Sequence, residues 1–435
     1  MTDRPITIRD AVHGDIALSV EEASLLDTFE FQRLRLIKQL GTSHLIYPTA
    51  VHTRFDHALG TLHMAQRLMD SLRSRGAEIG PQDERCVRFA ALLHDITHVP
   101  FGHTFEDERK LFERHDKGFR LDYYLRSPES ELADALARTG AADAVLDMLS
   151  PHGSQSDRPF LAQIVSSALD ADLFDYLRRD LTFTGLRQNY DDRIFTYFVV
   201  RDGSLVLDLQ KHGVIRADGL SETLNLLRLR YTLSERVYYH HTKAATAAML
   251  SKAVECASGL TERGLLSLGD EALMGKLEAE WSSRPAKHLM GKLRRRQIYK
   301  RAYQLTYEAI DNKADVAALI EKYHENLQTR ADMERTLAQG IGADPERAPV
   351  IIYCPAGKMY FKEAAVKAIL PGDIVVGLNA ADDRNPARAD LDLLQKKYRN
   401  LWSFYVFLDG ELIDKRGELA ELCEEAFGAA NVFQP

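Results

Sequence analysis

The sequence predicts a mainly α-helical fold, with an all-helical core at residues 1–345 and a small α+β lobe at residues 346–435. From Glu21 to about Gly340, apolar residues recur every three to five positions, as the buried face of a helix requires. Near Pro349 the pattern changes to short runs of β-branched and aromatic residues, which are typical of strands. The 435 residues, 45% hydrophobic and 28% charged, have a globular composition and suit two or three domains.

The N-terminal elements are expected in the following order. The first 20 residues contain two β-branched stretches and predict a hairpin or an irregular arm. Apolar spacing predicts helices over residues 23–40, 54–74 and 84–98, and Pro100 should stop the last of them. Residues 151–159 have the composition of a loop, and residues 161–181 predict a further helix.

Beyond this helix, a β-hairpin is expected near residues 196–210, where two β-rich runs are joined through Asp202 and Gly203. Long helices are expected from about Gly219 through Gln339. In the C-terminal lobe, residues 350–354, 373–378 and 403–409 predict strands, and residues 362–370 and 417–427 predict helices.

The composition also limits the compartment and the partners. Four dispersed cysteines without a C-x-x-C spacing argue against a disulfide framework or a thiolate zinc site. The N-terminus lacks an apolar signal segment, and no apolar run approaches the ~20 residues that cross a bilayer, so a cytoplasmic protein is expected. With 56 basic and 64 acidic residues, the net charge of −8 argues against general binding of polyanions, so nucleic acid is not a favoured partner.

Histidines are concentrated in one part of the chain, because nine of the 15 lie between His13 and His115. Four residues in strongly apolar helical segments stand out as a candidate metal site: His57, the pair His94-Asp95, and Asp172. A His-Asp pair can meet one ion if that ion lies near a helix end. Two imidazoles and two carboxylates suit Fe, Mn, Co, Ni or Zn, and Mg less readily. Each residue taken alone is also compatible with a hydrogen-bonded role in the core.

The longer string of motifs is far more specific. It reads Q-L-G at 39–41, H-T-R-F-D-H at 52–57, H-D-I-T-H-V-P-F-G-H at 94–103 and D-A-D-L-F-D-Y-L-R-R-D at 170–180. With these motifs in this order, the chain resembles the HD-domain phosphohydrolases, and among them the deoxynucleoside triphosphate triphosphohydrolases. The resemblance covers roughly residues 5–305 and implies an HD-domain helical core.

The resemblance implies a role for each matching residue. The metal ligands would be His57, His94, Asp95 and Asp172. The residues beside the scissile phosphate would be Arg54, His98, His103 and His115. One of the three histidines would be the general acid. A carboxylate that raises the pKa of this histidine could come from Glu106, Asp107, Glu108 or Asp116. The sugar and phosphate contacts would be Gln39, Arg54, Tyr176, Asp180, Arg230 and Tyr238. An activating nucleotide would meet Asp27, Gln32, Arg35, Arg296 and Lys300, although an amphipathic helix surface explains these five residues equally.

Two departures from the family pattern concern the substrate. Leu173 stands where the family has a lysine or arginine that meets the phosphate tail, so this contact would be weaker or supplied by Arg178, Arg230, Arg236 or Lys243. Thr97 and Val99 stand where glycines are usual, which implies either an ordinary backbone or a reshaped pocket.

The expected function is metal-dependent hydrolysis of deoxynucleoside triphosphates to deoxynucleoside and tripolyphosphate. One alternative is the same fold acting on nucleoside mono- or diphosphates or on cyclic or oligonucleotide phosphodiesters. A second alternative is a catalytically weak nucleotide sensor or assembly protein. The resemblance also implies a homo-oligomer, either a dimer or a tetramer.

Overall fold

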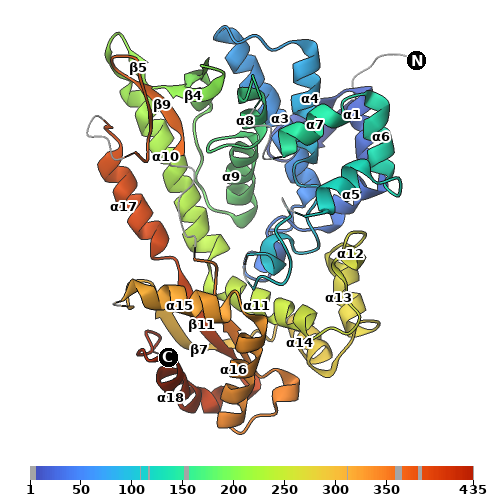
Figure 1. The fold of residues 1–435 in the computed structure, drawn as a ribbon, viewed down its shortest axis with the longest axis vertical. Helices are drawn as coiled ribbons and strands as arrows, with labels where there is room; N and C mark the ends of the chain where they lie inside the picture. The colour runs from blue at the N-terminus through green and yellow to red at the C-terminus, as the bar shows by residue number, and fades with distance from the viewer. Residues whose placement is uncertain are drawn as a thin grey trace.

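Helices dominate the N-terminal half of the chain, as the apolar spacing predicts, and form the upper right part of the molecule in Figure 1. The computed structural model describes residues 6–107, 109–115, 118–150, 156–310, 312–357, 365–380 and 385–434. The expected hairpin at the N-terminus is present, since β1 (Ile6–Asp10) pairs antiparallel with β2 (Gly14–Leu18). The helices that follow are α1 (Val20–Leu26), α2 (Phe29–Gln32), α3 (Arg54–Ser74), α4 (Pro81–Leu93), α5 (Arg120–Arg126), α6 (Glu131–Thr139), α7 (Ala142–Leu149), α8 (Phe160–Val165) and α9 (Ala171–Thr184).

Several of the expected helices are shorter than predicted. The segment 23–40 is divided into α1, α2 and a 3₁₀ turn at Arg33–Leu36, and the segment 161–181 is divided into α8 and α9. Helix α4 ends at Leu93, well before Pro100, so that His94 lies at the helix end. Within the predicted loop at 151–159, only residues 156–159 are described, and they lie outside helices and strands.

Helix α3 is the centre of this half, because α4 packs on it from one side and α9 from another. A capping box fixes its first turn: the Thr53 hydroxyl accepts from the backbone of Asp56, and the Asp56 carboxylate accepts from the backbone of Thr53. Helix α9 is started by Asp170, whose side chain accepts from the Leu173 amide, and ended by Gly185 at a φ of 73°. These caps set where the polar residues of α3 and α9 meet.

Among the described residues, the second half contains helices and three sets of paired strands. The helices are α10 (Ala217–Leu233), α11 (His241–Glu255), α12 (Glu262–Leu265), α13 (Asp270–Glu278), α14 (Arg284–Arg294), α15 (Lys313–Tyr323), α16 (Leu327–Gly340), α17 (Arg388–Arg399) and α18 (Arg416–Phe427). The strands are β3 (Phe198–Arg201), β4 (Ser204–Asp208), β5 (Gln210–Lys211), β6 (Val214–Ile215), β7 (Lys300–Thr306), β8 (Val350–Tyr353), β9 (Lys367–Leu370), β10 (Ile374–Gly377) and β11 (Ser403–Leu408).

Two strands correct the sequence prediction. The segment Lys300–Thr306 forms strand β7 inside the region expected to be continuously helical, and residues 367–370 form β9 where a helix was expected. Strand β11 pairs with β7 on one side and with β8 on the other, whereas β9 pairs with β10 and, in parallel, with β4 of the expected 196–210 hairpin. Both sheets therefore join strands from either side of residue 345.

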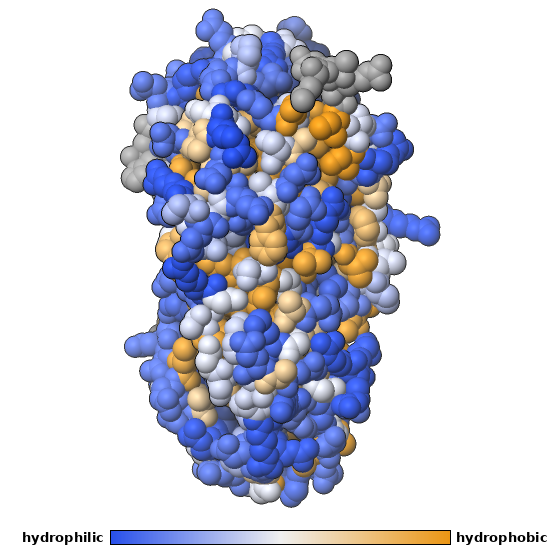
Figure 2. Space-filling view, turned by 90° about the vertical axis from the view of Figure 1, so that its right-hand side faces the viewer, coloured by the Kyte–Doolittle hydropathy of each residue, from blue (hydrophilic) through white to orange (hydrophobic). Residues whose placement is uncertain are grey.

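The surface is mostly hydrophilic on the face that Figure 2 shows, with hydrophobic side chains gathered at its upper end and across its middle. Within the described ranges, no helix combines the length and the apolar character needed to cross a membrane.

The contact between α3 and α9 depends on a glycine. A Cβ atom at Gly60 of α3 would overlap the carboxylate of Asp175 on α9 and approach the guanidinium of Arg179. Both side chains are buried and hydrogen-bonded, so moving either of them aside would cost free energy of folding.

We therefore predict that Gly60→Ala destabilises the protein by about 1–3 kcal/mol, as overpacking of a core does. The matched control is Gly275→Ala in α13, where a Cβ meets no atom within 4 Å. This change should stabilise by about 0.5–1 kcal/mol, because alanine restricts the unfolded chain. Urea unfolding of both variants measures the difference. Equal stabilities of the two variants would contradict this account of the helix contact.

Candidate active site

Two histidine rings are oriented so that their Nε2 atoms meet. On α3, His57 donates from Nδ1 to the carboxylate of Asp175 at 2.7 Å. At the end of α4, His94 donates from Nδ1 to the carbonyl of Ala91 at 2.8 Å. The two Nε2 atoms then lie 3.2 Å apart, with their lone-pair positions turned toward a common point.

Two carboxylates complete this group. An oxygen of Asp172, in the first turn of α9, lies 3.0 Å from His57 Nε2 and 3.8 Å from His94 Nε2. Asp95, directly after His94, lies 3.7 Å from His57 Nε2 and 3.6 Å from His94 Nε2. The structure thus brings together all four residues that the sequence analysis selected as metal ligands. The end of α4 at Leu93 allows His94 and Asp95 to face the same point.

The donor set fits a divalent ion. An ion with bonds of about 2.1 Å separates neighbouring ligands by roughly 3.0–3.4 Å, close to the distances found here. His57, His94 and Asp172 form one of the groups in the described ranges whose donor atoms all lie within 4.8 Å of one another. Imidazole and carboxylate donors suit Mn, Fe, Co, Ni or Zn, so these distances do not select one metal.

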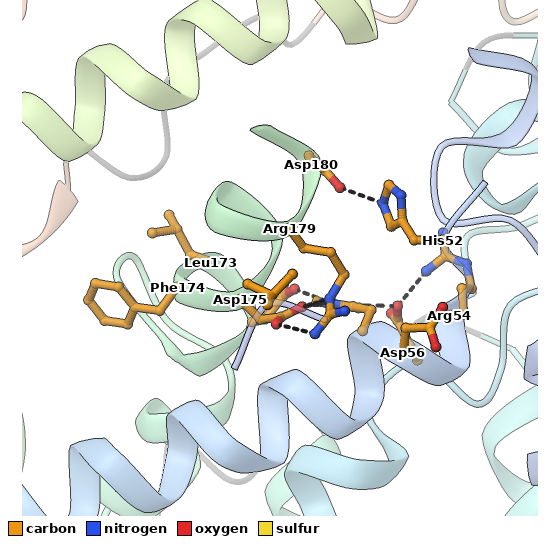
Figure 3. Close-up of polar contacts among 12 residues, drawn as sticks. His52, Arg54, Asp56, Leu173, Phe174, Asp175, Arg179 and Asp180 are labelled. Atoms are coloured by element: carbon orange, nitrogen blue, oxygen red, sulfur yellow. Dashed lines mark hydrogen bonds and ion pairs between the residues drawn. The ribbon is translucent and has the colours of Figure 1, made fainter. Parts of the chain in front are cut away.

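Asp175 is a residue of the site that the sequence analysis missed. Its carboxylate accepts from His57 Nδ1, from His13 Nε2 at 2.6 Å and from two nitrogens of Arg179, both at 2.9 Å. Figure 3 shows Asp175 and Arg179 side by side on α9. Burial acts against the charge of Asp175, but these cationic partners hold its pKa well below the ordinary value. A carboxylate behind a ligand histidine fixes the tautomer and the ring orientation. The sequence signal that could have identified Asp175 is its position three residues after Asp172, which places both carboxylates on one side of the helix.

A second cluster adjoins the first. The ring of His98 stacks on that of His115 with centroids 3.7 Å apart, and His103 meets both rings edge-on. The carboxylate of Glu106 accepts from His115 Nδ1 at 2.9 Å. Donor atoms of these three histidines and Glu106 also lie within 4.8 Å of one another. Glu108 and Asp116, the other acidic neighbours named from the sequence, lie outside the described residues.

The three histidines differ in their protonation. Burial and the nearby guanidinium of Arg54 hold the pKa of His98 well below its ordinary value, and burial lowers the pKa of His115. Desolvation also acts against a charge on His103, but hydrogen bonds to Asp107 and Glu106 outweigh it and raise its pKa to about 9. Its side chain is 46% exposed. At neutral pH, His103 is therefore the histidine of this cluster that carries an available proton.

Arg54 connects the two clusters. The guanidinium pairs with Asp95 through Nη1, and its remaining atoms lie against Gly102, where a Cβ atom would overlap Nη2. Gly102 has a φ of 58° and follows Phe101, which takes the left-handed conformation at 61°. Thr97 and Val99 do not have a positive φ, so the absence of glycine at these two positions does not strain the backbone.

Aromatic and polar side chains gather beside the histidines. Asp180 on α9 accepts from His52 Nε2 at 2.9 Å, as Figure 3 shows, and from the hydroxyl of Tyr238 at 2.6 Å. The guanidinium of Arg230 lies over the rings of Tyr176 and Tyr238, 5.4 and 5.0 Å from their centroids. His52 is a further member that the sequence analysis named only as part of a motif. Gln39 adjoins this group through a backbone hydrogen bond to His52, and its buried side-chain oxygen has no partner in the described structure.

Leu173 does not face this group. Its side chain is 3% exposed and belongs to the hydrophobic core, and Figure 3 shows it directed away from Asp175 and Arg179. Of the cations expected to replace a basic residue there, Arg178 is held by Asp192 at 2.6 Å and lies over Tyr190. Arg230, another of these cations, lies over Tyr176 beside the candidate site.

The five residues expected to hold an activating nucleotide lie in two groups. Arg35 donates to Gln32 at 2.9 Å, as their i, i+3 spacing predicts, and Asp27 follows the end of α1. Arg296 donates to the carbonyl of Leu45, and Lys300 begins β7. The described hydrogen bonds and ion pairs do not join the two groups, and the role of these residues stays a prediction.

Comparison with known proteins agrees with the geometry. A model of the HD domain matches residues 54–180, and a model of the HD associated region matches residues 192–421, more than half of the chain. A crystal structure of a phosphohydrolase from Bacteroides thetaiotaomicron superposes with a TM-score of 0.69 at 22% identity, covering 93% of this chain and 99% of that one. This likeness shows a shared fold.

Two relatives illustrate the range of similar sequences. An uncharacterized protein of Methanocaldococcus jannaschii is 31% identical over 311 residues, which cover 69% of this chain and 60% of that protein. The deoxynucleoside triphosphate triphosphohydrolase SAMHD1 of Gallus gallus is 28% identical over 341 residues, covering 67% and 55%. The chain thus spans little more than half the length of these relatives.

We predict that divalent metal binding to this site strengthens as the pH rises. Burial lowers the pKa of His57, but Asp172 and Asp175 outweigh it and raise that pKa to about 10 in the metal-free protein. The ion must displace the proton from Nε2, so below this pKa each added pH unit should tighten binding by up to about tenfold. Competition titration with Mn²⁺ at about pH 6.5 and 8.5 measures the effect. An affinity that does not change with pH would contradict the assignment of His57 as a ligand.

Proposed function

The chain belongs to the HD-domain family in which an HD-associated region follows the HD domain, and on that premise we propose that it is a metal-dependent phosphohydrolase. The convergence of His57, His94, Asp95 and Asp172 on one point, with Arg54 at its edge, carries the proposal. These four residues would hold a divalent ion. Such an ion activates water and polarises a phosphoryl group near neutral pH.

The remaining charged side chains have separate tasks. Asp175 fixes the ring of His57 and Ala91 fixes that of His94, so both Nε2 atoms are presented without further rearrangement. Arg54, anchored on Asp95, offers the rest of its guanidinium to a phosphate oxygen. Its buried Nε has no hydrogen-bond partner in the described structure, which supports this role.

His103 would supply the proton that the leaving oxygen of the nucleoside needs. With a pKa of about 9 it is protonated at neutral pH, and its half-exposed side chain is open to a substrate. His98 and His115, held neutral beside it, would pack around the phosphate and keep His103 and Glu106 in place.

A deoxynucleoside triphosphate is the substrate that we propose first. Asp180, already paired with His52 and Tyr238, offers carboxylate oxygens for a sugar hydroxyl, and the ring of Tyr176 provides an apolar surface for the sugar itself. Arg230 lies over this ring and can meet the phosphates. The similarity to the SAMHD1 triphosphohydrolases favours the same substrate class.

Leu173 supports the alternative of a shorter phosphate chain or a phosphodiester. Because its side chain is apolar and buried in the core, Leu173 itself cannot hold a β- or γ-phosphate. A catalytically weak nucleotide sensor is the alternative of another class, and the intact ligand set argues against it.

We predict that the purified protein with Mn²⁺, Co²⁺ or Mg²⁺ releases intact tripolyphosphate from deoxynucleoside triphosphates, as read by anion chromatography. Release of orthophosphate alone, from mono- or diphosphates, would favour the alternative substrates instead.

The double substitution His94→Ala and Asp95→Ala should abolish both turnover and bound metal, because it removes two of the four proposed ligands. His212→Ala, which changes an exposed histidine far along the chain, serves as the control. A double variant that keeps turnover and metal would overturn the site.

A further inference from the structure

A buried charged cluster lies outside the candidate active site, where the segment after Phe105 meets the C-terminal part of the chain. Arg109 of this segment is fully buried. Its Nη1 donates to Glu334 at 3.0 Å and to the carbonyl of Ile352 at 2.6 Å, and its Nη2 donates to Glu255 at 2.8 Å. One side chain therefore ties this segment to α16, to β8 and to α11.

Two further cations share the same carboxylates. Lys252 Nζ lies 2.6 Å from Glu255 and 2.7 Å from Glu334, and Arg330 lies 3.0 Å from Glu255. Arg109 and Arg330 are completely shielded from solvent, and Lys252 and Glu334 nearly so. The cluster holds three cations and two carboxylates. In surroundings that exclude water, such contacts are strong and depend steeply on geometry.

The segment that Arg109 anchors is the one that carries the proposed acid and its neighbours. The amides of Leu111 and Phe112 both donate to the carbonyl of Phe105, at 2.7 and 3.2 Å, so the chain reverses around Arg109. This reversal returns His115 to the side of His98 and His103. Glu106, three residues before Arg109, then meets His115.

We propose that Arg109 is a positioning residue, which holds the segment between His103 and His115 in its reversed course by fixing it to α11, α16 and β8. The C-terminal part of the chain thereby sets the geometry of the histidine cluster, although none of its residues belongs to that cluster. Only the catalytic consequence of this inference rests on the proposed function. Arg109 itself acts through the segment and not on a substrate.

The cluster offers a substitution that removes the anchor and leaves the charges balanced. In Arg109→Leu, two cations, Lys252 and Arg330, remain with two carboxylates, Glu255 and Glu334. The leucine also fills much of the apolar volume of the arginine stem. We therefore expect this variant to fold. Substitution of Glu334 would instead leave three cations beside one carboxylate, and is not suited to the test.

The first measurement compares steady-state kinetics with the nucleotide that the wild-type protein hydrolyses best. Arg109→Leu should lower kcat by about 10- to 100-fold, because a small displacement of an acid is costly. Bound metal should stay at the wild-type value, since the four proposed metal ligands lie outside this segment. Arg109→Lys, which keeps a cation with fewer donors, should recover part of the loss. The control is Arg335→Leu on α16, where the guanidinium pairs with exposed Asp332 and, among the described residues, with no other carboxylate.

The second measurement is hydrogen exchange, and it does not depend on activity. In Arg109→Leu the amides of Leu111 and Phe112 should exchange faster, whereas amides of α3 should be unchanged. Wild-type kcat in Arg109→Leu, or unchanged exchange at these two amides, would overturn the proposal. Parallel loss of kcat, metal and α3 protection would overturn it as well, since that pattern reports general unfolding. If the wild-type protein hydrolyses no nucleotide, the proposed function fails, and the exchange measurement alone decides on Arg109.

Discussion

The carboxylate of Asp175 is the contact on which the arrangement of the site depends. It joins three parts of the chain: α9, on which it lies; α3, through His57; and the N-terminal hairpin, through His13. Arg179 satisfies both of its oxygens from the next turn of α9 and is itself held by Asp10. A buried carboxylate is stable only when its hydrogen bonds are satisfied, so the network specifies one relative position of α3 and α9. The candidate metal ligands His57 and Asp172 are placed relative to each other by this contact.

Electrostatics divides the histidines of the site into two kinds. At His57 and His94, an acceptor at Nδ1 leaves Nε2 directed toward the candidate ion position. In the neighbouring cluster, acidic partners keep a proton on His103, whereas burial beside cations keeps His98 neutral. The candidate metal ligands and the proposed proton donor therefore differ in their partners, although His94 and His103 lie within one short stretch of sequence. Arg54 connects the two clusters, because it pairs with Asp95 and lies against Gly102.

The sequence was sufficient for the helices around the site and for selecting four residues that converge on one point, and physical reasons explain where it failed. The spacing of apolar residues reports on one buried face, which α3, α4 and α9 each possess. It does not report on pairing partners distant along the chain: β7 is a strand because β11 lies beside it. Residues 367–370, Lys-Ala-Ile-Leu, favour a helix locally, and their pairing with β10 and β4 overrides that preference.

The same limit applies to side chains. Asp175 and His13 are 162 residues apart in the sequence. The hydrogen bond between them could not be predicted from the residues that surround either one. Leu173 shows the converse case, because the sequence identified its departure from the family, and the structure shows its side chain buried in the core.

Anomalous diffraction from crystals grown with Mn²⁺ tests the central claim most directly. The account predicts one strong peak at about 2.0–2.3 Å from His57 Nε2, His94 Nε2 and an oxygen each of Asp95 and Asp172. Metal-saturated crystals in which these four side chains bind only one another, with the manganese located elsewhere, would contradict it.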